Sequence, residues 1–326
     1  MMRVLIRRRI HEAKWLLLAC SVANIWFCWV RVWIVSRVDT TRFKQILDLL
    51  PDDWQKFLTV DFAWMITYPG RVSLAYEELV VVGCISIWAI ARGSDCVSGE
   101  LGRGTMEMLL AQPVSRFAAI TTQAMVTIIG TAVVAGSAWV GNWLGILTTS
   151  AKQEVTASWQ LPIPLPLVGS EIPIPFAEPK TEYIPMTELL DASLFLPATV
   201  NLFAFGLMIA GFSAMMSAWD RYRWRTIGIV VGVYFLQSMA KLAGMAIEEI
   251  SWLSYLTAFT AYEPELAVRV ADLTPEFAWS FAITTADGSW QAHGPMTYHC
   301  ILGGLGLFFY AFAIWIFTRR DLPAPL

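Results

Sequence analysis

Six apolar stretches, each long enough to cross a lipid bilayer as a helix, constrain this chain more than any other feature. A helix of about 20 residues covers roughly 30 Å of hydrocarbon, and every stretch reaches about that length. Hydrophobic residues make up 56% of the 326 residues and charged residues 15%, a composition that excludes a soluble protein. We therefore predict an all-α polytopic membrane protein with a single transmembrane domain. Its six predicted spans are residues 15–34, 72–91, 117–147, 194–218, 227–247 and 297–317.

Lysine and arginine are distributed unevenly between the segments that join these spans. With the N-terminus inside, the inner segments carry 13 of these residues. The outer segments 35–71, 148–193 and 248–296 carry 8 over more than twice the length. The positive-inside rule then places both termini in the cytoplasm and the large loops outside. We expect a multi-pass protein of the bacterial cytoplasmic (inner) membrane.

The N-terminal residues 1–14 combine apolar side chains with a run of arginines at 7–9. This pattern predicts an amphipathic elbow helix in the headgroup boundary. A basic tail that only sets the topology is the alternative.

A polar segment at residues 94–116 separates the second and third spans. Gly102 and Gly104 are expected to end one helix, and Thr105 is a favourable N-cap for the next. That short helix would have a carboxylate in its first turn, an apolar face and a proline stop. Because a helix this short is not stable alone, it must dock on something; a helix lying on the lipid surface is the alternative. The residues predicted to dock are Glu100, Gly104, Thr105, Met106, Glu107, Leu109, Leu110 and Pro113.

The same segment reads Gly-Ser-Asp-Cys-Val-Ser-Gly-Glu at 93–100 and Gln-Pro-Val-Ser-Arg at 112–116. It closely resembles a segment of ABC-2 type transporter permeases, the membrane subunits of ATP-driven exporters. The ending Phe-Thr-Arg-Arg-Asp-Leu-Pro at 317–323 resembles the same family, particularly the subgroup near the copper-loading permease of nitrous oxide reductase maturation. The resemblance implies that 94–116 is a cytoplasmic coupling segment that docks into an ATP-binding subunit. It also implies a re-entrant hairpin within 248–296.

The function implied by the resemblance is that of a permease subunit that exports an unidentified substrate. Its expected partners are an ABC ATP-binding subunit, a second permease copy or paralogue, and the lipid bilayer, with no nucleic acid. No Walker A motif occurs in the sequence, so ATP would be bound by the partner and we expect neither an enzyme nor a cofactor. The three histidines lack ligand spacing, so no metal site is predicted. A non-transporting membrane anchor or assembly factor for envelope proteins is the alternative.

Four charged side chains, Arg31, Glu77, Glu78 and Lys241, lie inside the predicted spans. At the helical rise, each would sit roughly 5–9 Å below the outer boundary. Charges in the bilayer are costly unless paired, so two bases and two acids at one depth could form a neutral cluster. One interpretation is an outer gate in which, for example, Arg31 pairs with Glu77. The alternative is separate snorkelling to the interface, which is favoured for Arg31.

Two further patterns predict packing and loop structure. The glycine pairs 141/145 and 228/232 allow close helix approach, and we expect packing within one subunit rather than across a dimer. Alternating prolines at 162–175 predict an extended segment that folds back at Gly169–Ser170. Short interfacial helices interrupted at Pro51 are expected in 35–71.

Overall fold

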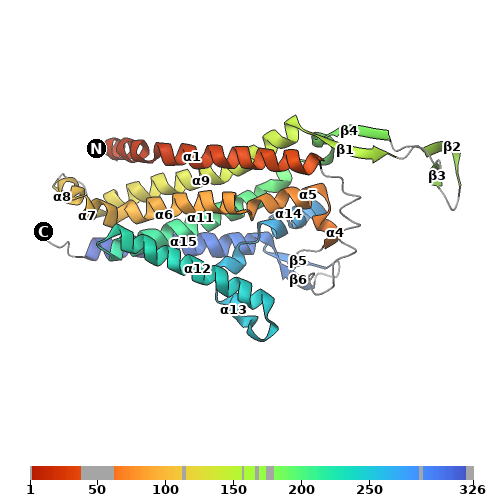
Figure 1. Cartoon of the computed structure of the whole chain (residues 1–326). Coiled ribbons are helices and arrows are strands. Elements are labelled where there is room, and N and C mark those ends of the chain that lie inside the picture. Colours follow the sequence, from red (N-terminus) through yellow and green to blue (C-terminus); the bar gives the residue numbers. More distant parts are fainter. Residues whose placement is uncertain are drawn as a thin grey trace.

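The computed structural model describes residues 2–37, 62–111, 115–155, 158–165, 169–173, 180–285 and 289–320. Within these residues, six helical segments are long and apolar enough to cross a membrane, and the long helices run along one another in a bundle (Figure 1). The predicted polytopic helical fold is confirmed. The principal helices are α1 (Met2–Arg37), α6 (Leu79–Ser94), α9 (Arg116–Thr148), α11 (Leu196–Trp219), α12 (Arg223–Ala246) and α15 (Pro295–Arg319).

One end of the bundle, here called the terminal end, holds the start of α1 and the end of α15. The short helices α7 (Glu100–Gly102) and α8 (Thr105–Leu110) lie at the same end (Figure 1). The even number of spans accounts for this arrangement, since each span reverses the direction of the chain.

The opposite end, here called the hairpin end, carries three antiparallel two-stranded sheets that the all-helical prediction did not include. They are β1 (Ser150–Val155) with β4 (Lys180–Pro185), β2 (Ser158–Leu165) with β3 (Gly169–Pro173), and β5 (Ala282–Thr284) with β6 (Trp290–His293). The described parts of the proline-rich segment, β2 and β3, are extended as predicted. Gly169 pairs with Leu165 and belongs to β3, so the turn predicted at Gly169–Ser170 is corrected to strand.

Short helical pieces complete the hairpin end. They are α4 (Phe62–Met65), α5 (Tyr68–Ser73), η1 (Leu74–Tyr76), α10 (Met186–Leu189), η3 (Ala192–Phe195), η4 (Glu248–Ile250), α13 (Trp252–Tyr255), η5 (Ala258–Ala261), α14 (Pro264–Leu273) and η6 (Pro275–Phe277). The helices predicted around Pro51 lie outside the described residues.

Helix α11 forms the centre of the bundle. Its residues Leu202, Phe205 and Ala210 are fully buried. A Cβ atom on Gly211 would meet the backbone oxygen of Gly306 at 2.4 Å. Helices α11 and α15 therefore touch along their backbones, which only glycine permits at this distance.

Helices α1 and α9 form a second close pair. A Cβ atom on Gly141 would lie 2.6 Å from the backbone oxygen of Ile25, and one on Gly145 would lie 2.6 Å from Val32. The predicted packing within the subunit is confirmed for this glycine pair. Gly228 and Gly232 of α12 instead have no atom within 4 Å of an added Cβ.

Two predicted boundaries differ in detail from the helices of the structure. The first helix is continuous from Met2 to Arg37, so 1–14 is not a separate elbow; no glycine or proline interrupts the chain there. The second predicted span, 72–91, lies within the apolar helical segment Tyr68–Gly102. Its first turns are irregular, because α5 ends at Ser73, η1 follows and α6 begins only at Leu79.

Candidate functional site

The end of α6 widens into a π-helical turn, Asp95–Gly99, before α7. A π turn shifts the backbone bonding pattern, and such turns often occur at functional sites. Ser217 of α11 bonds to this turn: its Oγ accepts hydrogen bonds from the N–H groups of Val97 at 3.0 Å and Ser98 at 2.9 Å. The same hydroxyl donates to the carbonyl of Ser94 at 2.9 Å. The polar segment is therefore anchored on the central helix.

Glu100 forms the centre of an ion-pair network at the terminal end. Its side chain is fully buried and lies 2.6 Å from Nη1 of Arg9 and 2.8 Å from Nη2 of Arg103. The hydroxyl of Thr105 donates to its other oxygen at 2.5 Å. Glu100 therefore bonds to groups of this chain, and its predicted direct contact with an ATP-binding subunit is corrected to an internal role.

Asp95 links three further elements. Its carboxylate lies 2.7 Å from Nη1 of Arg103, 3.3 Å from Nη1 of Arg223 and 3.8 Å from Nη1 of Arg92. The hydrogen bond to Asp95 raises the pKa of Arg103, so this guanidinium stays charged. Through Glu100 and Asp95 together, the base of α8 is joined to α1, α6 and the start of α12.

Three carboxylates, those of Glu12, Asp95 and Glu100, offer oxygens within 4.8 Å of one another. Such a group could hold a metal ion in other surroundings. Here Arg9 and Arg103 lie within 2.8 Å of oxygens of Glu100 and Asp95, and Arg8 lies 2.8 Å from Glu12, so arginines supply the compensating charge. The arrangement is that of an ion-pair network rather than a metal centre.

Helix α8 begins where the sequence predicts. Gly104 has a φ of 70°, a left-handed conformation that favours glycine, and so the predicted break is present. Thr105 is the first helical residue rather than a cap, and its hydroxyl bonds to Glu100. Met106 is buried, whereas Met108 is 65% exposed.

These two methionines change the predicted docking surface. Residues two apart on a helix point to different sides, so a buried Met106 leaves Met108 facing outward. Met106 therefore attaches α8 to its own chain. Met108 was missed, although the helical period could have identified it once one inward-facing residue was known. The side chains of Glu107, Leu109 and Leu110, together with Pro113, lie outside the described part of the chain.

The four intramembrane charges separate into two groups at the hairpin end. Nη1 of Arg31 lies 3.4 Å from Oε1 of Glu78, so the predicted pairing of Arg31 with Glu77 is corrected to the neighbouring carboxylate. Nζ of Lys241 lies 2.8 Å from Oε1 of Glu263, a residue of the predicted outer loop 248–296. Glu77 lines the same cavity of about 300 Å³ as Lys241 and Glu263.

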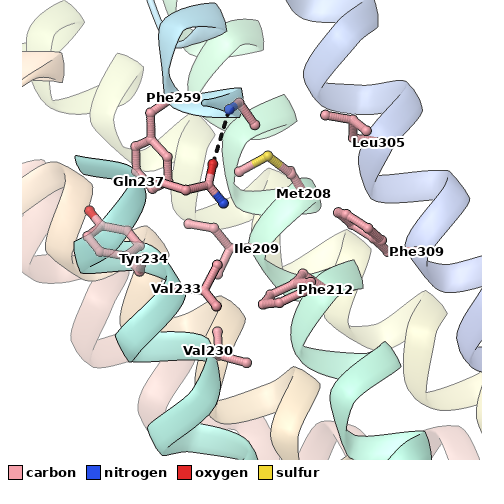
Figure 2. Close-up of a pocket in the computed structure, with 11 residues that line it drawn as sticks. Met208, Ile209, Phe212, Val230, Val233, Tyr234, Gln237, Phe259, Leu305 and Phe309 are labelled. Atoms are coloured by element: carbon pink, nitrogen blue, oxygen red, sulfur yellow. Dashed lines mark hydrogen bonds between the residues drawn. The ribbon is translucent and has the colours of Figure 1, made fainter. Parts of the chain in front are cut away.

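A second, apolar cavity of about 80 Å³ lies between α11, α12, α15 and η5 (Figure 2). Figure 2 shows Phe212 and Phe309 facing it from α11 and α15, with Val230 and Val233 on α12. On its hairpin side, Oε1 of Gln237 accepts a hydrogen bond from the N–H of Ala258 at 3.0 Å. Only 11% of the most apolar stretch of α12 is buried within this chain, against 72% for α11. Helix α12 is therefore the least enclosed of the spans.

Comparison with protein families places residues 40–322 in the family described as ABC-2 family transporter protein. The matched region begins after α1 and contains the other five spans. It also contains every residue of the ion-pair network apart from those on α1. A search of curated proteins finds no match to the chain. Because the family match covers most of the sequence and fits the helical membrane architecture, the chain belongs to the ABC-2 family of transporter proteins and is a membrane permease component.

Proposed function

We propose that this permease works with a separate ATP-binding subunit, which docks on residues 94–116 at the terminal end and drives export of a substrate across a bacterial inner membrane. The observation that supports this proposal best is the position of α8. It presents the exposed Met108, while its base is tied by ion pairs to three long helices. A displacement of α8 by a bound subunit would therefore be transmitted to these helices.

The route of transmission follows the two buried carboxylates. A displacement of α8 moves Thr105 and Arg103, which bond to Glu100 and Asp95. Glu100 holds Arg9 of α1, and Asp95 holds Arg223 of α12. The ATPase would thus act on α1 and α12 without unfolding the segment it touches.

Helix α12 is suited to be the moving element. A packed core resists deformation, but α12 is little buried and borders the cavity of Figure 2. At its far end, Lys241 bonds to Glu263 and to the carbonyls of Phe259 and Tyr262, each at 3.2 Å. A shift of α12 would therefore pull on the hairpin end, where the Arg31–Glu78 pair closes the outer side. In an assembly with a second permease copy, this coupled movement would open the substrate path alternately to the two sides of the membrane.

Docking can be tested by substituting the exposed methionine. The tagged full chain is purified from its native membrane, and the bound ATPase is measured as ATP hydrolysis in the eluate. We expect Met108→Glu to lose most of this activity, because burying an unpaired charge in a docking contact is strongly unfavourable. Val4→Glu, which places the same charge at another exposed apolar site of the terminal end, should retain it. A Met108→Glu variant with wild-type ATPase content and transport would show that α8 is not the docking element.

Orientation has a separate test. In a chain without its five native cysteines, a cysteine replacing the exposed Tyr183 of β4 should react with an impermeant thiol reagent in intact cells. A cysteine at Gly102, where an added side chain meets nothing within 4 Å, should react only after permeabilisation. The reverse pattern would place the terminal end outside.

A further inference from the structure

The cavity of about 300 Å³ at the hairpin end carries an excess of negative charge. Its charged lining residues are Glu77, Lys241 and Glu263, so two carboxylates accompany one ammonium group. The ammonium of Lys241 donates to Glu263 and to the carbonyls of Phe259 and Tyr262. These three acceptors use all of its donors. Lys241 therefore compensates Glu263, and one negative charge in the lining remains without a counterion.

That remaining charge belongs to Glu77, which lies between η1 and α6. Among the described residues, no hydrogen bond or ion pair joins its side chain to another group. The carboxylate interacts electrostatically with Lys241 and Glu263, so it lies on the cavity side of the chain. The residue is also exposed, and a ligand can therefore reach it. An uncompensated carboxylate in a membrane-spanning segment such as Tyr68–Gly102 is costly and marks a functional site.

Aromatic rings form the apolar wall of the same cavity. They belong to Phe205 of α11, Tyr234 of α12, Phe259 of η5 and Tyr262. The ring centroids of Phe205 and Phe259 are 5.0 Å apart, and those of Tyr234 and Phe259 are 4.9 Å apart. Tyr234 and Phe259 also line the apolar cavity of Figure 2. Aromatic rings attract organic cations and pack well against apolar groups.

We infer that this cavity binds an organic cation, whose positive group is held by Glu77 and whose apolar body packs against the aromatic wall. The excess negative charge disfavours an anion, and an inorganic cation would make no use of the aromatic wall. The inference rests on the proposed function, because it names the chemical class of the exported substrate. Tyr234 and Lys241 of α12 line the cavity, so the proposed movement of α12 would change the shape of the site.

The test measures binding to the full chain without its ATPase, so that it does not depend on docking. The purified chain is placed in lipid discs of phosphatidylcholine, which has no net charge, and binding is measured by equilibrium dialysis against empty discs. The cationic probe is benzyltrimethylammonium. Phenylacetate and benzyl alcohol carry the same ring with a negative charge or with none.

Three variants locate the binding site. Glu77→Gln removes the charge and keeps the shape of the side chain. Tyr234→Leu removes one ring of the wall. Glu248→Gln is the matched control, because it removes a carboxylate from an exposed residue of the hairpin end that does not line the cavity.

We expect saturable binding of benzyltrimethylammonium and much weaker binding of the other two probes. Glu77→Gln should raise the Kd of the cation at least about fivefold, because the opposite charge is lost. Tyr234→Leu should raise it about two- to fivefold, and Glu248→Gln should leave it unchanged. Equal binding of the three probes by the wild-type chain would overturn the inference without the use of any variant. An equal Kd in Glu77→Gln and Glu248→Gln would also overturn it.

Failure of this inference and failure of the docking proposal give different results. If the wild-type chain binds the cation and Met108→Glu keeps its ATPase, the docking proposal fails and the cation site stands. If the cation does not bind and Met108→Glu loses its ATPase, the docking proposal stands and the cation site is rejected.

Discussion

Nη1 of Arg9 and Oε1 of Glu100 lie 2.6 Å apart, although the two residues are 91 positions apart in the sequence. Both side chains are buried, at 4% and 0% exposure. This pair joins the start of the first helix to the base of the segment that we propose as the docking element. It therefore connects a membrane span directly to the site where ATP-driven movement would enter.

Charge reversal tests this connection. Arg9→Glu would place two carboxylates together in a buried site, and breaking a buried pair costs about 3–5 kcal/mol. We expect a lower thermal unfolding temperature and lost transport. The double variant Arg9→Glu with Glu100→Arg should recover part of the unfolding temperature and part of the transport activity. Reversal of the exposed Arg7 should change neither quantity by much. Absence of any recovery in the double variant would show that the two residues do not act as a pair.

The sequence could predict that residues 94–116 form a polar turn and a short helix, because glycines, a threonine and a proline are local signals. It could not predict which side chains face inward. Both Glu100 and Met106 are buried, and Glu100 bonds to Arg9, which is 91 positions away in the sequence. A pattern read along one helix contains no information on such partners.

The two glycine pairs provide a matched test of helix packing. Gly141→Leu would force a side chain against the backbone of Ile25, and overpacking of this kind costs about 1–3 kcal/mol or more. We expect a clear fall in the thermal unfolding temperature of the purified chain. Gly232→Leu adds the same atoms where nothing lies within 4 Å and should leave the unfolding temperature of a single subunit almost unchanged. Equal losses in the two variants would contradict the packing of α1 on α9.

The pair at the hairpin end can be tested for a gating role. Glu78→Gln should leave Arg31 with a weaker partner and reduce transport, while ATPase co-purification stays normal. Reversal of both charges, Arg31→Glu with Glu78→Arg, should restore transport, because the 3.4 Å contact can form with either polarity. Reversal of Arg31 with Glu77 is the control and should not restore it. If transport returns in the Arg31/Glu77 double variant and not in the Arg31/Glu78 double variant, Glu77 is the partner of Arg31 and our assignment is wrong.

The hairpin end was the part least accessible to prediction. Intramembrane charges at one depth indicated pairing, but the choice between Glu77 and Glu78 depends on how the chain breaks between η1 and α6. Likewise, Lys241 bonds to Glu263 because the chain that follows η5 packs against α12. Contacts of this kind depend on tertiary packing and cannot be read from the sequence, whereas the number and approximate length of the spans follow from hydropathy.

Glu265 of α14 gives the fold a dependence on pH. Burial raises its pKa to about 7; Arg269 partly offsets this, and the nearby Glu77 and Glu263 add to it. Between the ordinary value of 4.5 and about 7, the folded chain binds more protons than the unfolded chain, so stability falls as pH rises, by up to about 1.4 kcal/mol per pH unit. We expect the unfolding temperature to fall between pH 5 and pH 8, and Glu265→Gln to flatten this slope. The exposed Glu248→Gln should retain it, and equal slopes in wild type and Glu265→Gln would contradict the assignment.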